Sequence, residues 1–354
     1  MKARQVHYDV MRIVAILLVL YNHLPAYHLF HNGEGAALVG GMAMSVLTRI
    51  NVPLFAMVSG ALLLGRTESY ADLWRKRISR MLLVIVIFEA AIYVEFYFTR
   101  SYEASLSGFL YGMLGGSLKG FTSYWFLYAY LGFLVMLPFL RSVAQQMRRA
   151  DFLWLVGFQV LLTTVVPLVS LVLQLTGLGA FKLSPNFVVS LSTVGLYFYP
   201  LIGYWIDRNV DVAALTRRQW AAMAAVVVAG MLLAGLATWT YDENFKGYTQ
   251  NYLGLTAYLT TAFVFLALKR IFSAGFSLRW PSAARALTTV GSLVFGVYLM
   301  DQALKLVLYE EIKPTLTDAV GTFGFSVVWC IISLVVCGAA TWLLKRLPLF
   351  RNIL

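Results

Sequence analysis

The chain has 354 residues, of which 60% are hydrophobic and only 12% are charged, and its mean hydropathy is +0.75. Soluble domains contain roughly 25% charged residues, so this composition excludes a soluble globular protein and predicts an all-α protein that crosses a membrane several times. The net charge of +12 is dispersed between apolar segments, which argues against a nucleic-acid partner and favours contact with anionic membrane lipids.

Apolar segments of roughly 20 residues, long enough to cross a bilayer as helices, recur along the whole chain. Lys and Arg gather on alternate flanks of these segments, which predicts that both termini are cytoplasmic. The stretch 104–120 is apolar but glycine-rich and is expected to be re-entrant or interfacial. No linker or repeat divides the chain, so 1–354 is interpreted as a single membrane domain. The expected spans number about ten and cover 8–29, 38–65, 81–99, 121–140, 152–174, 187–206, 219–240, 252–268, 287–308 and 321–344.

The first predicted span contains two ionisable residues, Arg12 near its inner end and His23 near its outer end. The intervening residues make about three helical turns, so both side chains are expected on one stripe, about 16 Å apart along the axis. Ionisable groups inside a membrane are costly and usually mark a functional site that faces the protein interior. Asp9 lies three residues before Arg12 and is expected to pair with it, as a structural anchor or to hold the guanidinium toward a polar pocket.

His23 follows Asn22 and has two interpretations. A membrane histidine often serves only as a hydrogen-bond partner between helices. Imidazole also titrates near neutral pH, so His23 would act as a general base toward a hydroxyl, or as a nucleophile that briefly holds an acyl group. His28 and His31 follow nearby, but their spacing does not match a zinc site, and no metal is predicted.

A basic cluster that includes Lys76, Arg77 and Arg80 precedes the third predicted span. Two explanations remain open. The cluster follows the rule that cytoplasmic flanks are positive, with contact to lipid headgroups, or it binds the phosphates of a nucleotide-bearing donor. Arg77 and Arg80 would then lie one helical turn apart. Asn51 and Ser59 are further polar candidates in the second span.

Polar and aromatic residues also fall in later spans. Glu89 and Glu95 in the third span have no obvious partner in their own helix, so each needs one elsewhere or stays protonated. Tyr124, Trp125 and Tyr128 form an aromatic group near the outer end of the fourth span, where they serve as a membrane belt or stack on a sugar ring.

Two pairs in the last predicted spans have structural explanations. Asp301 and Lys305 are four residues apart and are expected to neutralise each other. Cys330 and Cys337 are expected to be reduced and structural, because two cysteines on one apolar helix do not indicate a disulfide framework.

Taken in order, several of these segments resemble the acyltransferase-3 family of integral membrane acyltransferases. Position 301 is Asp where many members have His, so no catalytic role is assigned to it. The resemblance covers nearly the whole chain and lies in 8–15, the Arg12-x10-His23 spacing, 51–60 ending in Ser-Gly, Arg77-Ile-Ser-Arg80, 123–128 with Pro138, and 295–301.

The resemblance implies a multi-pass protein of the bacterial inner membrane. It implies transfer of an acyl group, usually acetyl, from cytoplasmic acetyl-CoA or another acyl-CoA to a hydroxyl of an extracytoplasmic glycan or lipid-linked sugar. This form is expected to lack an appended soluble esterase-like domain, so the acceptor meets the membrane domain directly or a glycan-synthesis partner protein serves. The implied roles are catalytic for His23 and Arg12, donor-binding for Arg77, Arg80 and Lys76, and supporting or substrate-lining for Asp9, Asn22, Ser59, Tyr124 and Trp125.

Two other functions would also use some of these residues. In a secondary transporter, Arg12, Glu89, Glu95 and Asp301 would couple ions to solute movement. A scaffold subunit of a glycan-synthesis complex would leave Arg12 and His23 without a reason to lie in the membrane. The ordered motifs favour the enzyme.

Overall fold

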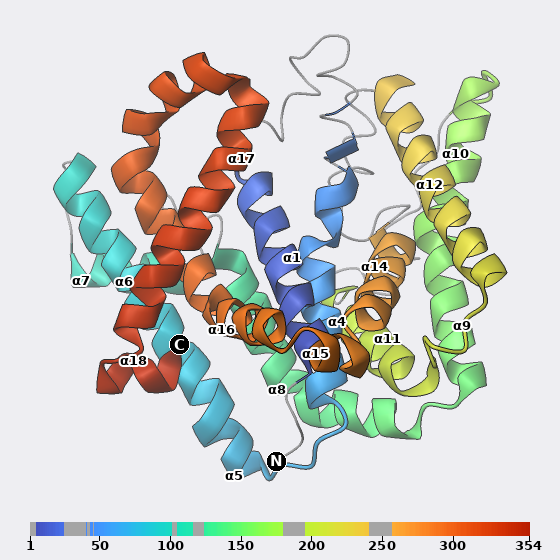
Figure 1. Ribbon diagram of the computed structural model, residues 1–354, viewed down its shortest axis with the longest axis horizontal. Helices are drawn as coiled ribbons and strands as arrows, with labels where there is room; N and C mark the ends of the chain where they lie inside the picture. Colours follow the sequence, from blue (N-terminus) through green and yellow to red (C-terminus); the bar gives the residue numbers. More distant parts are fainter. Residues whose placement is uncertain are drawn as a thin grey trace. The chain divides into compact units, whose positions relative to one another are not determined.

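The computed structural model describes residues 5–24, 40, 43–44, 46–100, 105–115, 124–179, 195–240 and 257–354. Within these ranges the regular structure is helical and contains no strand, which confirms the all-α class (Figure 1). Three described stretches are long and apolar enough to cross a membrane, namely Trp125–Gln146, Ala257–Arg279 and Pro281–Leu344. The number of spans and the side on which the termini lie stay predictions, and His28 and His31 fall outside the described residues.

The chain divides into two compact units. Unit 1 comprises Met1–Arg66 and Leu140–Gly291, and unit 2 comprises Thr67–Phe139 and Ser292–Leu354. The boundaries fall within α8 (Trp125–Gln146) and α16 (Pro281–Leu304).

Unit 1 is built around α1 (Val6–Asn22) and α4 (Asn51–Leu63), which contact each other (Figure 1). A short 3-10 helix, η2 (Thr48–Ile50), leads into α4 and also contacts α1. Both α1 and α4 contact α14 (Ala257–Ile271), and α4 packs most extensively against α11 (Gly195–Asn209). The other helices of this unit, with those just named, are α9 (Arg149–Val160), the π-helix η5 (Leu161–Val165), α10 (Val166–Leu175), α11 (Gly195–Asn209), α12 (Arg217–Thr240), α14 (Ala257–Ile271) and α15 (Ala274–Arg279).

Two glycines explain how α4 and α11 approach so closely. A Cβ atom at Gly60 of α4 would lie 2.0 Å from the carbonyl oxygen of Pro200 in α11. A Cβ atom at Gly203 of α11 would lie 2.2 Å from the carbonyl oxygen of Met57 in α4. Small residues let helix backbones meet in membrane proteins, where burial of apolar surface does not drive helix association. The Ser-Gly end of the segment 51–60 therefore has a packing role that the sequence did not reveal.

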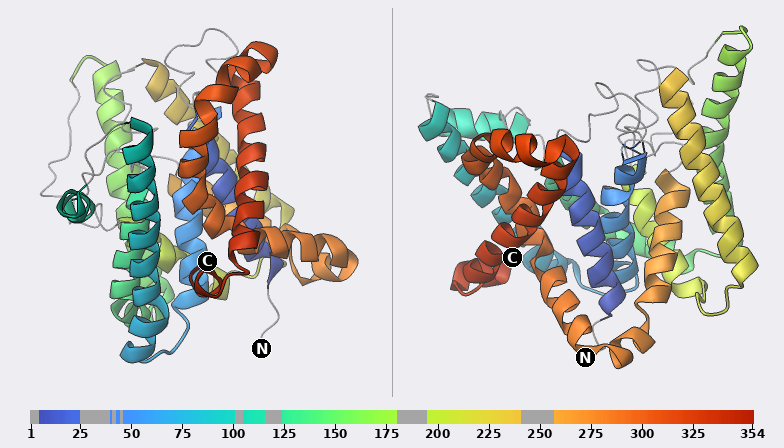
Figure 2. Two further views of the ribbon diagram at one scale, coloured as in Figure 1. Left: turned by 90° about the vertical axis from the view of Figure 1, so that its left-hand side faces the viewer. Right: turned by 45° about the horizontal axis from the view of Figure 1, so that its top comes forward.

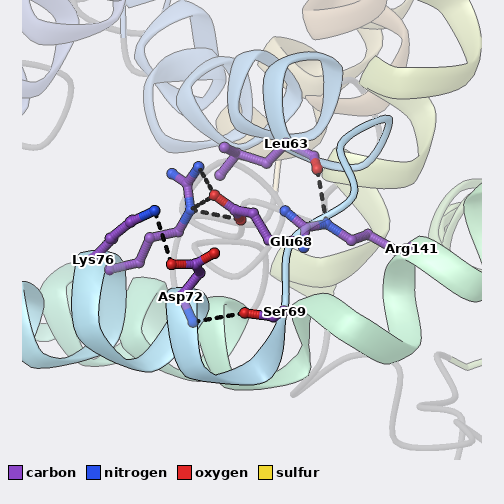
Figure 3. Close-up of polar contacts among 7 residues, drawn as sticks. Leu63, Glu68, Ser69, Asp72, Lys76 and Arg141 are labelled. Atoms are coloured by element: carbon purple, nitrogen blue, oxygen red, sulfur yellow. Dashed lines mark hydrogen bonds and ion pairs between the residues drawn. The ribbon is translucent and has the colours of Figure 1, made fainter.

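The C-terminal end of α4 is held by side chains of α8. Arg141 is buried, and its Nε donates a 3.0 Å hydrogen bond to the carbonyl oxygen of Leu63 (Figure 3). Gln145 Nε2 donates a 2.9 Å bond to the carbonyl oxygen of Leu64. The last carbonyls of a helix have no partner within it, so these two side chains cap α4.

Unit 2 contains α6 (Ser79–Arg100), α7 (Leu106–Gly115), the beginning of α8 and the C-terminal helices. A tight turn of helix, α5 (Tyr70–Leu73), and the π-helix η3 (Trp74–Ile78) precede α6. At the C-terminal end the chain runs through α16, the π-helix η6 (Lys305–Tyr309), α17 (Glu310–Leu344) and α18 (Pro348–Ile353).

Helices α16 and α17 lie antiparallel (Figure 2). Lys345 Nζ donates to the carbonyl oxygen of Ser292 at 2.7 Å, and Ser333 Oγ donates to Asp301 Oδ1 at 2.7 Å. The backbone of Gly321 has φ 70° and ψ 170°, which breaks α17 where the last predicted span begins. Cys330 and Cys337 are both buried within α17.

Candidate functional site

The first helix is enclosed along its whole length. None of its described residues, from Val6 to Leu24, is exposed. The helix ends at Asn22, and His23 is its C-cap, with its backbone N–H bonded to the carbonyl oxygen of Leu20. Arg12 therefore lies within the helix and His23 lies at its C-terminal end.

At one end of α1, Arg12 and Asp9 form the expected ion pair. Arg12 Nη1 lies 3.2 Å from Asp9 Oδ1, and the side chains are 31% and 1% exposed. Gly291 packs directly against Asp9, because a Cβ atom at Gly291 would lie 2.5 Å from Asp9 Cβ. A buried carboxylate fixed in this way orients the partly exposed guanidinium, a group whose geometry suits carbonyl, carboxylate and phosphate oxygens.

At the other end of α1, His23 and Asn22 are both half-buried. The Oδ1 atom of Asn22 is buried and accepts no hydrogen bond from any residue that the structure describes. A buried amide oxygen without a donor is costly, and such a group is commonly satisfied by water or a ligand. The polar end of α1 thus has an acceptor next to the imidazole.

A polar cluster beside the N-terminal part of α1 was not foreseen from the sequence. Lys269 Nζ lies 2.9 Å from Asp207 Oδ1 and also donates to the carbonyl oxygen of Asp207 at 2.6 Å. Tyr8 hydrogen bonds to Asp207, and His7 lies within electrostatic reach of both Asp207 and Lys269. The only sequence signal was that Asp207 and Lys269 each follow an apolar segment. Charged residues follow apolar segments in most membrane proteins, so this signal is not specific.

His7, which precedes the first predicted span, makes this cluster sensitive to acid. Burial is the main cause that lowers the pKa of His7 from 6.5 to about 4. The unfolded chain then binds the proton first as the pH falls, so stability declines between pH 6.5 and 4. We expect a loss of about 2 kcal/mol between pH 7.5 and 5. Thermal unfolding of wild type and His7→Gln at both pH values measures this loss of stability. An equal pH dependence of stability in the two proteins would refute the prediction.

Arg49 is a second residue that sequence reasoning did not single out. It falls within the expected span 38–65, where no role was assigned to it, and in the structure it lies in η2 with only 8% of it exposed. A buried guanidinium in a membrane protein is unusual enough to be a functional candidate, here in a segment that contacts α1. Ser59, by contrast, donates its hydroxyl to the carbonyl oxygen of Phe55 in its own helix at 2.9 Å.

The basic residues before α6 are engaged in contacts within unit 2. Arg77 forms a bidentate pair with Glu68, with Nη2 2.7 Å from Oε1 and Nε 3.0 Å from Oε2 (Figure 3). Arg80 Nε donates to the carbonyl oxygen of Ile353 at 3.3 Å. Lys76 pairs with Asp72 at 2.8 Å on the surface (Figure 3). In this structure each cation thus faces an oxygen of the protein itself.

The backbone here differs from the regular α-helix that the Arg77 and Arg80 spacing assumed. Residues Trp74–Ile78 form a π-helix, in which a turn contains more residues than an α-helical turn. Ser79 Oγ donates to the carbonyl oxygen of Trp74, five residues earlier, at 2.9 Å, which satisfies an acceptor of the widened turn. Local sequence gives little signal for such a bulge, although bulges of this kind are frequent at functional sites.

The aromatic group of the fourth predicted span has one buried member and two partly exposed members. Tyr124 is 1% exposed, and its hydroxyl donates to the carbonyl oxygen of Leu299 at 2.6 Å. Trp125 and Tyr128 are partly exposed.

In the same unit, Asp301 and Lys305 form the expected pair, with Lys305 Nζ 2.9 Å from Asp301 Oδ2. Asp301 also accepts from Ser333, so its two oxygens are both engaged.

Comparison with known proteins identifies a family. A family model described as an acyltransferase domain matches residues 6–342, which include residues of both units. No curated protein and no solved structure matches the chain. Within the residues that the structure describes, no three His, Cys, Asp or Glu side chains are grouped to bind a metal ion.

Proposed function

The chain belongs to the acyltransferase-3 family, and from this we propose that it moves an acyl group, usually acetyl, from cytoplasmic acyl-CoA across the membrane to a hydroxyl of an extracytoplasmic glycan or lipid-linked sugar. Its apolar helices and its family make it a membrane acyltransferase. The proposal rests on one observation above all. The enclosed helix α1 has a fixed arginine near one end and a histidine at the other.

We propose that His23 activates the acceptor. Its imidazole removes the proton from the hydroxyl while the hydroxyl oxygen attacks the thioester carbonyl. The carbon–sulfur bond then breaks, and the proton passes to the departing thiolate of CoA. In the alternative sequence, His23 attacks first, holds the acyl group, and passes it to the hydroxyl. Both sequences consume one acyl-CoA and release one CoA thiol for each ester formed.

Arg12 is proposed to stabilise the negative charge on the thioester oxygen or on the donor, because Asp9 fixes the position of its guanidinium. Arg49 is a further candidate for this role because a buried guanidinium remains charged. Arg77, Arg80 and Lys76 are proposed to bind the phosphates of the donor. Guanidinium groups bind phosphate with two parallel hydrogen bonds, as Arg77 now binds Glu68.

The proposal is tested on surface glycans. Mass spectrometry of glycans from cells with and without the protein is expected to show one added acyl mass that depends on the protein. If the glycans of the two strains have the same masses, and no acylated lipid-linked sugar differs between them, the proposed acceptor class is wrong.

The donor proposal gives a separate prediction at Glu68. Phosphate must displace Glu68 from Arg77, so Glu68→Gln is expected to lower the KM for acyl-CoA roughly fivefold, which corresponds to about 1 kcal/mol. The matched control is Asp151→Asn, because its partner Arg148 is 81% exposed and has no proposed role in donor binding, and such exposed pairs contribute little. The KM of both variants is measured by thiol release. An unchanged or higher KM in Glu68→Gln would argue against Arg77 as a donor ligand.

A further inference from the structure

Glu89 is a buried carboxyl group that the proposed reaction does not yet use. It lies in α6 and is 2% exposed. One oxygen, Oε1, accepts a 2.7 Å hydrogen bond from the hydroxyl of Tyr128. The other oxygen, Oε2, is buried and accepts no hydrogen bond from any described residue. Because a buried acceptor without a donor is costly, the bare oxygen indicates a ligand that supplies one.

Trp125 and Tyr128 provide an aromatic surface beside this carboxyl group. They lie three residues apart at the start of α8, so they share a face of the helix. Trp125 is 39% exposed and Tyr128 is 37% exposed, whereas the residues that precede them, Tyr124 and Leu127, are buried. The exposed indole lies one helical turn from the tyrosine that binds the carboxyl group, so an apolar face and a hydrogen-bond acceptor are offered to the same ligand.

The Tyr128 hydroxyl has one proton and two acceptors. Besides Glu89 it lies 3.2 Å from the carbonyl oxygen of Met113 at the end of α7. Its bond to Glu89 uses Oε1, so a ligand that donates to Oε2 leaves this bond in place. Tyr128 thus fixes the carboxyl group while the second carboxyl oxygen is available to the ligand.

We propose that Glu89, Tyr128 and Trp125 form a subsite for a sugar ring of the acceptor. A ring hydroxyl donates to Glu89 Oε2, a second hydroxyl bonds to the Tyr128 oxygen, and the C–H face of the ring packs on the Trp125 indole. An uncharged polyol fits better than a cation, because among the described residues no second carboxylate bonds to this pair and no group of side chains could bind a metal ion. The inference rests on the proposed function and names the acceptor-binding part of it.

Protection of Glu89 from chemical modification tests the subsite in the full-length protein. Dicyclohexylcarbodiimide, which reacts with carboxyl groups in apolar surroundings, is added to protein in lipid nanodiscs, and the adducts are located by mass spectrometry. The probes are the octyl glycosides of glucose, galactose, mannose and N-acetylglucosamine, and an octyl ether without sugar is the control. Glu89→Gln identifies the Glu89 adduct, and Glu95 on the same helix is the internal reference.

We expect at least one glycoside to slow labelling of Glu89 at least fivefold, without effect from the octyl ether and without a change at Glu95. Equal protection by the octyl ether, or none by any of the glycosides, would overturn the subsite. Tyr128→Phe is further expected to lower glycan acylation at least tenfold, while Tyr111→Phe, on the exposed face of α7, leaves it unchanged. Equal acylation by both variants would also overturn it.

Labelling does not depend on transfer, so the two proposals fail differently. If the wild-type protein cleaves no acyl-CoA but a glycoside still protects Glu89, the proposed function is wrong and the sugar subsite remains. If the wild-type protein acylates glycans and no glycoside protects Glu89, the subsite is wrong and the function remains.

Discussion

Replacing His23 with alanine is expected to lower the rate of acyl transfer by a factor of about 10²–10⁴, the usual contribution of a general base. The imidazole lies at the end of α1 rather than inside its packed length, so the change should leave the fold intact. Acylation of surface glycans and thiol release from acyl-CoA measure the effect. The thermal unfolding midpoint, measured on the same preparation, should stay within a few degrees of wild type.

Two further results separate the roles of His23. If His23 holds the acyl group, wild-type protein without acceptor should release a burst of thiol equal to the amount of enzyme, and His23→Gln should abolish this burst. If His23 is only a base, no burst is expected in either protein. Normal glycan acylation in His23→Ala would remove His23 from the mechanism altogether.

Gly60→Ala is expected to have the largest effect on stability, a loss of more than about 3 kcal/mol. The added methyl group would lie 2.0 Å from the carbonyl oxygen and 2.4 Å from the Cα of Pro200, so helix backbones rather than flexible side chains must move. Because α4 also contacts α1, the shift would disturb the helix that holds Arg12. We expect little folded protein in a size-exclusion profile after detergent extraction.

The same substitution elsewhere in unit 1 is the matched control. Gly157 lies within α9, and nothing lies within 4 Å of a Cβ atom placed there, so Gly157→Ala should be neutral or stabilising by up to about 1 kcal/mol. Gly203→Ala should behave like Gly60→Ala, because its Cβ would lie 2.2 Å from the carbonyl oxygen of Met57. Equal yields of folded protein from Gly60→Ala and Gly157→Ala would contradict the close crossing of α4 and α11.

Features that depend on local spacing were predictable from the sequence. The pair of Asp9 and Arg12 and the pair of Asp301 and Lys305 follow from three- and four-residue spacing within one helix. The all-α class follows from the length and apolarity of the segments. The break at Gly321 coincides with the expected start of the last span, because glycine tolerates the positive φ found there.

Features that depend on tertiary contacts were not predictable. The partner of Arg77 is Glu68, nine residues away across a turn, and the partner of Arg80 is the carbonyl oxygen of Ile353 near the other end of the chain. The packing role of Gly60 is recognised only from the structure, where Gly60 lies against the backbone of Pro200. The burial of Arg49 was not predictable because it depends on how η2 packs in unit 1, which local sequence does not show.

Thiol release from acetyl-CoA by the purified protein in lipid vesicles tests the central claim most directly. A membrane acyltransferase that uses His23 should release CoA thiol in proportion to time and enzyme, faster with a glycan acceptor, and His23→Ala should not. A secondary transporter would leave the thioester intact. Intact acetyl-CoA after prolonged incubation with folded wild-type protein and acceptor glycan would contradict the account.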